Sequence, residues 1–514
     1  MNGADSLLRT LVDSGVEVCF ANPGTSEMHF VAALDGEPRM RPVLTLFEGV
    51  ATGAADGYAR MAGRPAATLL HLGPGLGNGL ANLHNARRAG TPLVCVVGDH
   101  ATDHAPLDAP LQSDIAAVAG SVSGWVRHSA SPAAVGADAA DAVAAARRGQ
   151  VATLVLPADV SWGAGGRAAA PVAAPAPDRV DPDALTAAAR ALRGGEPAVL
   201  LIGGDATRAD GLAAANRVAA ATGARLLAET FPTRLERGAG VAPVARLAYL
   251  GDAARHQLGG ARHLVLVGTR SPVTFFGYPG RDGDLVPDGC AVHPVGGPPA
   301  RALAELADLL APGTSAGVAA QRRPDLPTGE LTVATAAAVV GALLPEGAIV
   351  VDEAITSGLG LPDATAGAPR HDWLTLTGGA IGYGLPAATG AAVACPDRPV
   401  WCLQADGSAM YTISALWTHA REGLDVTTVI YHNSAYAILR MELAAVGARG
   451  GAGGTASAGL FDLGRPELDF TALARGMGVP AVRVRTAEEL AAALRRADAE
   501  PGPHLVEAML PAVA

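Results

Sequence analysis

The sequence predicts an α/β protein with three doubly wound parallel-sheet domains, and three observations lead to this fold class. The chain has 514 residues, too many for one core and suited to about three domains of typical size. Short apolar runs of strand character alternate with Ala-rich stretches of helical character, which indicates parallel sheets. Two stretches rich in Pro, Ala and Gly, roughly Gly163–Val180 and Ala311–Thr328, are typical of linkers between domains.

The apolar runs fall into the three blocks that these linkers define. In the first block we expect strands at Val16–Phe20, Ala67–His71, Leu93–Val97 and Thr153–Leu156. In the middle block we expect them at Ala198–Ile202, Ala224–Ala228 and His263–Val267. In the third block we expect them at Ala348–Val351, Val400–Gln404, Val426–Tyr431 and His504–Glu507. The predicted domains span residues 1–165, 180–312 and 328–514.

The composition excludes several classes of function. Nearly half of the residues are apolar, and a net charge of −11 without basic runs argues against nucleic acid or a membrane as partner. The chain contains no lysine, since all 38 basic residues are arginine. Pyridoxal-phosphate and Schiff-base aldolase chemistry need a lysine amine, and a P-loop needs a lysine for its phosphates, so these functions are excluded.

The five cysteines are scattered without the C-x-x-C spacing of metal or redox sites. They lie in apolar surroundings at Cys19, Cys95, Cys290, Cys395 and Cys402, so we expect buried free thiols. The N-terminus lacks the pattern of a signal peptide, and no apolar run reaches membrane-spanning length. We therefore expect a cytoplasmic protein.

The segments Ala405-Asp406-Gly407-Ser408 and His432-Asn433-Ser434-Ala435 carry the most specific signal. Each follows a predicted strand, so Asp406 and Asn433 should lie at the carboxyl edge of one parallel sheet, where such sheets bind ligands. A carboxylate and an amide oxygen are suitable ligands for Mg²⁺, which also takes phosphate oxygens. The turn from Asp406 into a helix offers backbone N–H groups to an anionic diphosphate.

Four further segments contain candidate functional residues. Glu48 follows the apolar segment Val43–Phe47 and starts an Ala-rich helix, so we expect it to point into a cavity rather than into solvent. Thr377–Ala388 is a Gly-rich connection from strand to helix. Asn22–Glu27 and His71–Asn78 each follow a strand, which places both at one sheet edge.

Taken together, these motifs resemble those of thiamine-diphosphate-dependent enzymes of the benzoylformate decarboxylase and acetolactate synthase type. The resemblance covers the whole chain and implies a pyrimidine-binding, a middle and a diphosphate-binding domain, in that order. It departs from the family pattern at Ala405, where a Gly is usual, and at His432, where an Asn is frequent. Neither residue supplies a metal ligand in the family.

The resemblance implies a role for each matching residue. Mg²⁺ would be bound by Asp406, Asn433 and the backbone carbonyl of Ala435, and the diphosphate by Asp406, Gly407 and Ser408. The carbonyl of Gly379 would contact the aminopyrimidine, and Ile381 would bend the two cofactor rings together. Glu48 would hydrogen-bond the aminopyrimidine, whose imino tautomer then removes the C2 proton.

The resemblance also indicates which side chains face the substrate. Thr25 and His71 match substrate-facing residues of benzoylformate decarboxylase, and His100 is a weaker candidate in another strand-end loop. Ile438 and Glu442 are four positions apart on one helix face near the pocket. Glu442 would disfavour a plain aryl substrate and suit a polar or cationic one, unless it is simply a solvated helix residue. Phe275-Phe276 match a second histidine only loosely.

The function implied is thiamine-diphosphate- and Mg²⁺-dependent cleavage of a 2-oxo acid, a lyase reaction in which decarboxylation proceeds through an enamine. The alternative is a transferase of the acetolactate synthase type, which joins the enamine to a second 2-oxo acid or aldehyde. Active sites would lie between the subunits of a homodimer or homotetramer. FAD is not expected, because Ile202-Gly203-Gly204-Asp205 is not G-x-G-x-x-G.

Two other functional classes remain open from the sequence. A non-catalytic protein could use the same fold, although the presence of Glu48 argues against it. A nucleotide-dependent oxidoreductase is suggested only by the parallel-sheet pattern. The stretch Gly447–Gly459 is nearly all Gly, Ala and Ser, and we expect it to form a lid over the substrate site.

Overall fold

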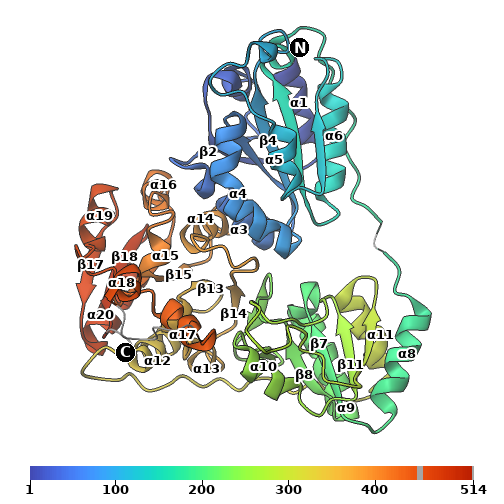
Figure 1. The fold of residues 1–514 in the computed structure, drawn as a ribbon, viewed down its shortest axis with the longest axis vertical. Coiled ribbons are helices and arrows are strands. Elements are labelled where there is room, and N and C mark those ends of the chain that lie inside the picture. The colour runs from blue at the N-terminus through green and yellow to red at the C-terminus, as the bar shows by residue number, and fades with distance from the viewer. Residues whose placement is uncertain (177, 448–454, 512–514) are drawn as a thin grey trace.

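Three sheets flanked by helices make up the protein, as the sequence predicts. The computed structural model describes residues 1–176, 178–447 and 455–511. Pairing within the sheets is parallel with one exception, so the α/β fold class is confirmed. Figure 1 shows the three blocks as separate lobes, with the extended segment that follows α7 connecting the first lobe to the second. Within the described residues, every helix is too short or too polar to cross a membrane.

The first block contains a six-stranded parallel sheet in the order β2-β1-β3-β4-β6-β5. Its strands are β1 (Val18–Asn22), β2 (Arg41–Leu44), β3 (Ala66–Leu70), β4 (Leu93–Asp99), β5 (Trp125–His128) and β6 (Val151–Pro157). Its helices are α1 (Gly3–Asp13), α2 (Met28–Leu34), α3 (Glu48–Ala62), α4 (Leu72–Ala89), α5 (Ile115–Gly120), α6 (Val135–Ala146) and α7 (Ala158–Trp162), with short 3-10 helices η1 (Thr25–Glu27) and η2 (Ala105–Leu107).

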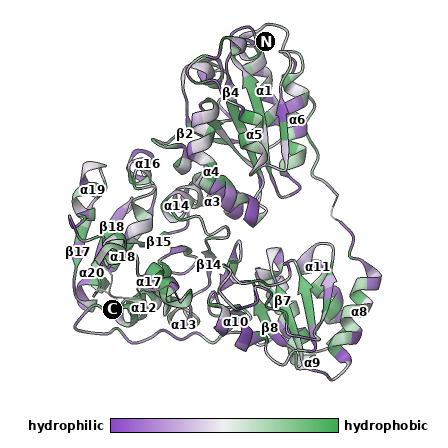
Figure 2. Cartoon of the chain, viewed as in Figure 1, coloured by the Kyte–Doolittle hydropathy of each residue, from purple (hydrophilic) through white to green (hydrophobic). Residues whose placement is uncertain are grey.

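The middle block contains a five-stranded parallel sheet in the order β10-β8-β7-β11-β12. Its strands are β7 (Ala198–Ile202), β8 (Arg225–Ala228), β10 (Ala245–Arg246), β11 (His263–Val267) and β12 (Ala291–Val295). Its helices are α8 (Pro182–Arg193), η3 (Gly204–Thr207), α9 (Ala209–Thr222), α10 (Gly251–Leu258) and α11 (Pro299–Leu310). In Figure 2 the central strand β7 is green, whereas α8 on the outside carries purple, as expected for a buried sheet covered by amphipathic helices.

The third block contains a seven-stranded sheet in the order β17-β18-β16-β15-β13-β14-β9. Its strands are β9 (Leu235–Arg237), β13 (Ile349–Glu353), β14 (His371–Leu374), β15 (Val400–Ala405), β16 (Val426–His432), β17 (Ala481–Val484) and β18 (His504–Met509). Its helices are α12 (Val333–Leu343), η4 (Ile355–Gly358), α13 (Leu361–Ala364), α14 (Gly384–Ala394), α15 (Asp406–Ala409), α16 (Ala415–Glu422), α17 (Ala437–Ala445), α18 (Thr455–Leu460), α19 (Phe470–Gly476) and α20 (Ala487–Ala499). The edge strand β9 comes from the middle of the chain and pairs antiparallel with β14, which ties the two blocks together.

Helix α3 of the first block packs closely against α14 of the third. A Cβ added to Gly57 would lie 2.2 Å from the carbonyl oxygen of Ala387, and one on Gly390 would lie 1.8 Å from that of Ala54. Real side chains do not tolerate such contacts, so glycine at both positions permits the close approach of the two helices. Apolar residues of both blocks share one buried cluster around this contact.

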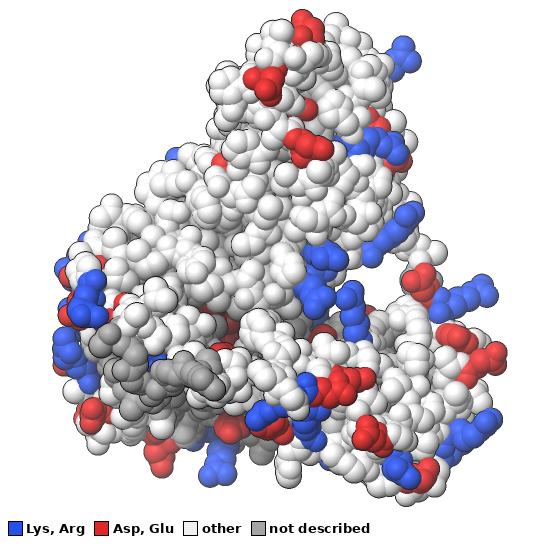
Figure 3. All heavy atoms as spheres, in the orientation of Figure 1, with Lys and Arg blue, Asp and Glu red and all other residues white. Residues whose placement is uncertain are grey.

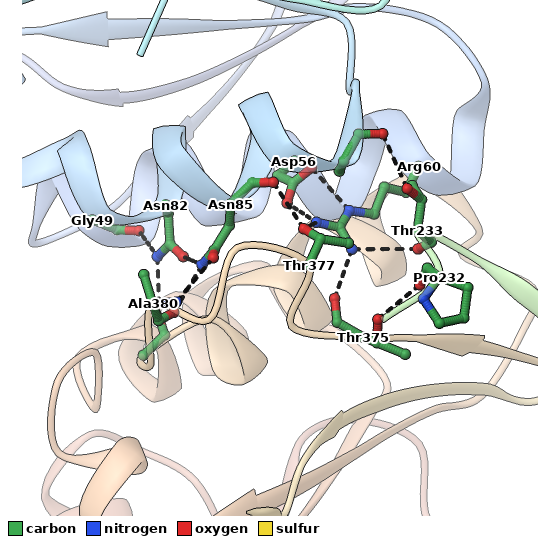
Figure 4. A network of polar contacts seen from close by, with 12 residues as sticks. Gly49, Asp56, Arg60, Asn82, Asn85, Pro232, Thr233, Thr375, Thr377 and Ala380 are labelled. Carbon is green, nitrogen blue, oxygen red and sulfur yellow. Dashed lines mark hydrogen bonds and ion pairs between the residues drawn. The ribbon is translucent and has the colours of Figure 1, made fainter. Parts of the chain in front are cut away.

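A buried polar network joins the same two blocks and also reaches the middle one (Figure 4). The Arg60 guanidinium forms an ion pair with Asp56 and donates to the Thr375 carbonyl at 2.8 Å, and both side chains of the pair are fully buried. Arg60 also donates to the carbonyl of Thr233 in the middle block. Asn85 on α4 donates to the carbonyl of Ala380 at 2.8 Å. The three blocks are therefore connected at the point where the Gly-rich Thr377–Ala388 segment passes.

The cysteines only partly follow the sequence prediction. All five are free, which is as expected, and Cys19, Cys95 and Cys402 are buried. Burial raises the pKa of the Cys95 thiol to about 11. Cys290 and Cys395 are only partly buried, so the expectation of burial was wrong for these two. Cys290 directly precedes the edge strand β12, where one side of the sheet has no neighbouring strand.

Candidate active site

Asp406 and Asn433 lie side by side at the carboxyl edge of the third sheet. Asp406 directly follows β15 and Asn433 directly follows β16, and these two strands pair in parallel. Both oxygens of Asp406 are held by backbone donors: Gly407 N–H donates to Oδ1 at 2.8 Å, and Ser434 N–H donates to Oδ2 at 2.7 Å. Asn433 N–H also donates to Oδ2 at 3.1 Å. The strand-end geometry predicted for this pair is therefore present.

His432 contacts this loop through its buried imidazole. Its side chain is fully buried, with Nδ1 2.8 Å from Glu507 Oε1 and Nε2 3.1 Å from the hydroxyl of Ser434. Ser434 has a φ of +55°, in the left-handed region that non-glycine residues seldom adopt. In this conformation the N–H of Ser434 donates to Asp406, and its hydroxyl contacts His432.

The donor set fits the Mg²⁺ site that the sequence predicts. A carboxylate offers about four lone-pair positions and an amide oxygen two. Three backbone N–H groups donate to the Asp406 carboxylate, and Ala435 N–H donates to Asn433 Oδ1 at 3.0 Å. Each side chain thus keeps acceptor capacity for a cation. Burial raises the pKa of Asp406, and its backbone donors and His432 oppose this rise. No group of three or more acidic, His or Cys side chains suited to a metal occurs among the described residues, and this site would need only one carboxylate.

Glu353 holds the Gly-rich segment at the same carboxyl edge of the sheet. It ends β13 and is buried, and its two oxygens accept from the N–H groups of Gly382 and Gly384, each at 2.7 Å. Gln404 donates to the same carboxylate at 2.9 Å and also to the hydroxyl of Ser408. Burial raises the pKa of Glu353, and these donors lower it. Glu353 therefore links the turn after Ile381 to the loop that carries Asp406.

A cavity of about 1050 Å³ opens between the middle and third blocks at this edge. This volume is just above the usual range of about 300–1000 Å³ for ligand pockets. Its wall contains the predicted cofactor and substrate residues of the third block, namely Gly379, Ile381, Asp406, Gly407, Ser408, Asn433, Ala435, Ile438 and Glu442. The third block therefore gathers its predicted site residues around one space that can hold a cofactor.

Glu48 begins helix α3, as predicted, and lies at the carboxyl edge of the first sheet. The residue is only 7% exposed, and the side-chain amide of Asn78 donates to Glu48 Oε2 at 2.9 Å. A Cβ added to Gly75 would lie 3.3 Å from Glu48 Oε1 and 3.4 Å from His71 Cβ. Glu48 and His71 are therefore neighbours on either side of Gly75.

His71 is held by Glu27, a residue that sequence reasoning did not single out. The Nδ1 atom of His71 lies 2.8 Å from Glu27 Oε2, and the Glu27 side chain is 1% exposed. Glu27 also accepts from Gly24 N–H and from the hydroxyl of Ser26, both at 2.7 Å. A Cβ on Gly24 would lie 2.2 Å from His71 Nδ1, so glycine permits the imidazole to lie against the backbone.

The remaining candidates of the first block lie along the same sheet edge. Thr25 is exposed at the start of η1, and it is the adjacent Ser26 whose hydroxyl lies 3.3 Å from His71 Nδ1. His100 follows β4, and its Nε2 atom is buried without a hydrogen-bond partner. None of the four predicted residues Thr25, Glu48, His71 and His100 lines the cavity between the middle and third blocks of this chain. The predicted site residues of the chain therefore form two separate groups, one in the first block and one in the third.

Glu442 has defined partners from the middle block. Its two oxygens accept from the hydroxyls of Tyr249 at 3.0 Å and Tyr278 at 2.7 Å. It therefore differs from a solvated helix carboxylate, which was one of the two interpretations of the sequence. Of the stretch predicted as a lid, residues 448–454 lie outside the described residues.

Four residues that shape the site were missed by sequence reasoning, and the reason is the same for each. Each is recognised only through a partner distant in sequence: Glu27, Glu353, Tyr249 and Tyr278. Glu27 could have been noticed, because it closes the quoted Asn22–Glu27 motif and lies three residues after Gly24, a spacing typical of a helix start. The other three follow no motif.

Comparisons with known proteins match both ends of the chain to one family. Residues 1–119 match the family described as thiamine pyrophosphate enzyme, N-terminal TPP binding domain, and residues 364–508 match the corresponding C-terminal TPP binding domain. Thiamine pyrophosphate is another name for thiamine diphosphate. A Mycobacterium tuberculosis protein named "Putative acetolactate synthase large subunit IlvX" is 67% identical over 100% of both chains. Benzoylformate decarboxylase of Pseudomonas aeruginosa is 31% identical over 96% of both chains.

The fold is also that of a solved enzyme. Thiamine diphosphate-dependent 4-hydroxybenzoylformate decarboxylase of Rhodococcus jostii superposes with a TM-score of 0.85 at 24% identity, covering 99% of both chains. The matched domains contain Glu48 at one end of the chain and Asp406 with Asn433 at the other. The chain therefore belongs to the thiamine pyrophosphate-dependent enzymes, in the group that includes decarboxylases and acetolactate synthases.

Proposed function

We propose that the protein is a thiamine-diphosphate- and Mg²⁺-dependent decarboxylase that converts a 2-oxo acid and a proton into an aldehyde and CO₂. When bound, the cofactor supplies a carbon nucleophile for the oxo group and an electron sink for the bond that breaks. The chain's own residues must hold the cofactor, orient the acid and deliver a proton to the carbon that loses CO₂.

The cofactor would be held by residues around the large cavity. Asp406, Asn433 and the carbonyl of Ala435 would bind Mg²⁺, and the adjacent backbone would bind the diphosphate. Gly379 and Ile381 line the same cavity, which supports their assignment to the cofactor rings. Glu353 would keep them in place through the turn that it binds.

The observation that carries decarboxylation is the pairing of His71 with Glu27. With Nδ1 fixed on a buried carboxylate, the neutral imidazole is set as the tautomer that donates from Nδ1. The Nε2 atom then remains to exchange a proton with the substrate. Glu48 lies next to this imidazole, so cofactor activation and proton delivery would occur in one place.

We further propose that two copies of the chain complete each site, in a homodimer or homotetramer. The first-block residues do not line their own chain's cavity, so the Glu48 side chain would have to come from a second copy. Apolar side chains are exposed beside both half-sites: Leu46 precedes Glu48 and is 51% exposed, and Tyr411 lines the cavity and is 55% exposed. Figure 3 shows a broad uncharged area across the first and third blocks, and an interface needs such a surface.

A carboligase is the second candidate, because the relative at 67% identity carries the name of an acetolactate synthase. In that reaction two 2-oxo acids and one proton give a 2-hydroxy-3-oxo acid and one CO₂. The residues assigned above would serve both outcomes, so product analysis has to separate them.

The test is incubation of the protein with thiamine diphosphate, Mg²⁺ and single 2-oxo acids, with CO₂ and organic products both quantified. One aldehyde per CO₂ supports the decarboxylase, and one CO₂ per two acids consumed supports the carboligase. The same assay is run on His71→Ala. Without the imidazole, proton delivery and therefore decarboxylation should slow by about 100-fold or more. Lack of any thiamine-diphosphate-dependent CO₂ release would contradict both.

A further inference from the structure

The cavity has an aromatic wall supplied by the middle block. Four rings line it and contact one another: Phe231, Tyr249, Phe275 and Phe276, with centroid separations of 5.2 to 6.3 Å. Most of these contacts are edge-to-face, the arrangement that stabilises aromatic clusters. Phe275 and Phe276 are 41% and 51% exposed, which is high for phenylalanine. A wall of exposed rings facing a cavity indicates a site for an aromatic or apolar group.

This wall begins beside the segment assigned to the cofactor. A Cβ added to Gly379 would lie 2.3 Å from Cζ of Phe275, so the ring rests directly against that glycine. Gly379 has a φ of +74°, which other residues rarely adopt. Phe275 in turn contacts Tyr249 at 5.2 Å between ring centroids. The aromatic wall therefore extends from the cofactor end of the cavity towards Tyr249.

The far end of the wall carries a carboxylate. Tyr249 donates its hydroxyl to Glu442, which lines the cavity from α17, and Tyr278 donates to the other oxygen. Burial first, and the bond to Glu442 second, raise the pKa of Tyr278 to about 12, so its hydroxyl stays a donor at neutral pH. Within the described part of the chain, two of about four lone-pair positions on Glu442 are used, which leaves the others for a ligand.

We propose that Glu442 selects, for the reaction proposed above, 2-oxo acids whose aromatic ring carries a hydrogen-bond donor at the end remote from the oxo group. The ring would lie along Phe275 and Tyr249, with its oxo group at the cofactor end. A hydroxyl or amino group on the far side of the ring would donate to Glu442. This inference rests on the proposed function and names the substrate class for it.

The physical reason for selection is the cost of an unpaired carboxylate. A ring without a donor would cover Glu442, displace its water and leave the charge without compensation. Sites that hydrogen-bond a substrate group discriminate strongly against analogues that lack it. The apolar rings alone would discriminate less strongly, because one methylene group in a hydrophobic pocket is worth about 10- to 200-fold.

The competing explanation is that the two tyrosines and Glu442 only clamp α17 to the middle block. Substitution at two positions separates these roles. Glu442→Leu removes the acceptor, whereas Tyr278→Phe removes one clamp bond and keeps the carboxylate. Two probes of similar shape, 4-hydroxybenzoylformate and 4-methoxybenzoylformate, differ in whether they can donate.

The wild-type enzyme should prefer the hydroxy probe over the methoxy probe in kcat/KM by about 1000-fold or more, beyond what an apolar pocket supplies. Glu442→Leu should remove most of this ratio, and Tyr278→Phe should keep it. If kcat/KM fell equally for both probes in both variants, Glu442 and the tyrosines would only attach α17 to the middle block, and the proposal would be overturned. A wild type that prefers pyruvate to both aryl acids would also overturn it, with the proposed function intact.

Binding gives a readout that does not depend on turnover. In the Glu48→Gln protein, loaded with cofactor and Mg²⁺, calorimetry should show tighter binding of the hydroxy than the methoxy probe, and the added Glu442→Leu change should equalise them. If wild type releases no CO₂ from any 2-oxo acid, the proposed function fails, and this binding comparison still decides the role of Glu442. Equal affinity of the two probes in Glu48→Gln would refute the selection.

Discussion

His71 Nδ1 lies 2.8 Å from the buried carboxylate of Glu27, and this contact fixes the imidazole beside Glu48. A histidine with one nitrogen bound to a carboxylate is held in one tautomer and one ring orientation. The other nitrogen is then positioned for proton exchange. Because Glu27 and His71 come from different strand ends, the first sheet itself aligns the pair.

Replacing Glu27 should therefore impair catalysis without removing the imidazole. In Glu27→Gln one of the two acceptor oxygens becomes an NH₂ group, which cannot accept a hydrogen bond. The side chain can then no longer accept from all of its donors, so the His71 ring loses its fixed orientation. We expect kcat to fall by about 100-fold, with smaller change in KM. Steady-state kinetics measure this, and Ser26→Ala is the matched control, because it removes the hydroxyl that contacts both Glu27 and His71 but keeps the carboxylate–imidazole pair. Equal effects of the two variants would contradict the role of Glu27.

Glu48→Gln should bind thiamine diphosphate but activate it poorly. The amide cannot stabilise the protonation state of the aminopyrimidine that a carboxylate does, so exchange of the cofactor C2 proton should slow by about 100-fold or more. Exchange into deuterated water, followed by NMR of the released cofactor, measures this step directly. Asn78→Ala removes the side-chain amide that donates to Glu48 and should cost far less. Unchanged exchange in Glu48→Gln would refute the assignment.

Asp406→Ala should abolish Mg²⁺-dependent cofactor retention. The substitution removes a cation ligand and leaves three backbone N–H donors without their acceptor. We expect the affinity for thiamine diphosphate to fall by at least 100-fold in the presence of Mg²⁺, and chelation of metal from wild type should have a similar effect. Equilibrium dialysis measures both. Tight, chelator-resistant binding in Asp406→Ala would place the metal elsewhere.

Glu229 in the middle block should make stability depend on pH. It follows β8, and burial raises its pKa from 4.5 to about 7, with a bond from Thr269 opposing the rise. Because the folded state holds the proton more tightly, the stabilisation is present below pH 4.5 and is lost as pH rises to about 7.

Glu229→Gln stays neutral and keeps an acceptor for Thr269. Its unfolding free energy relative to wild type should rise between pH 5 and 7 and reach a plateau of about 3 kcal/mol above that range. Urea denaturation of both proteins at several pH values measures the difference. A pH-independent difference would contradict the raised pKa.

The sequence revealed the sheets better than the contacts across the site. The strands Ala198–Ile202 and His263–Val267 were predicted with the bounds that the structure has, because each is a continuous apolar run between helix and turn signals. Strand β9 was missed, since Leu235–Arg237 is short and polar and becomes a strand only by pairing with β14.

Site residues follow the same rule. Asp406 and Asn433 were found because the strand-helix-strand pattern between them determines where they meet. The partners of Glu442 could not be found, because Tyr249 and Tyr278 reach it from another block and no sequence spacing encodes that contact. Tertiary packing between blocks supplies this information.

The buried pair of Asp56 and Arg60 gives the last prediction. Both side chains are fully buried, and Arg60 also donates to Thr375 and Thr233 in the other two blocks. Arg60→Met leaves the Asp56 carboxylate buried and unpaired, so unfolding free energy should fall by about 3–5 kcal/mol. The double variant Asp56→Asn/Arg60→Met removes the charge as well and should recover part of this loss. Urea denaturation compares the three proteins, and a double variant no more stable than Arg60→Met would show that the interblock bonds, not the buried charge, dominate.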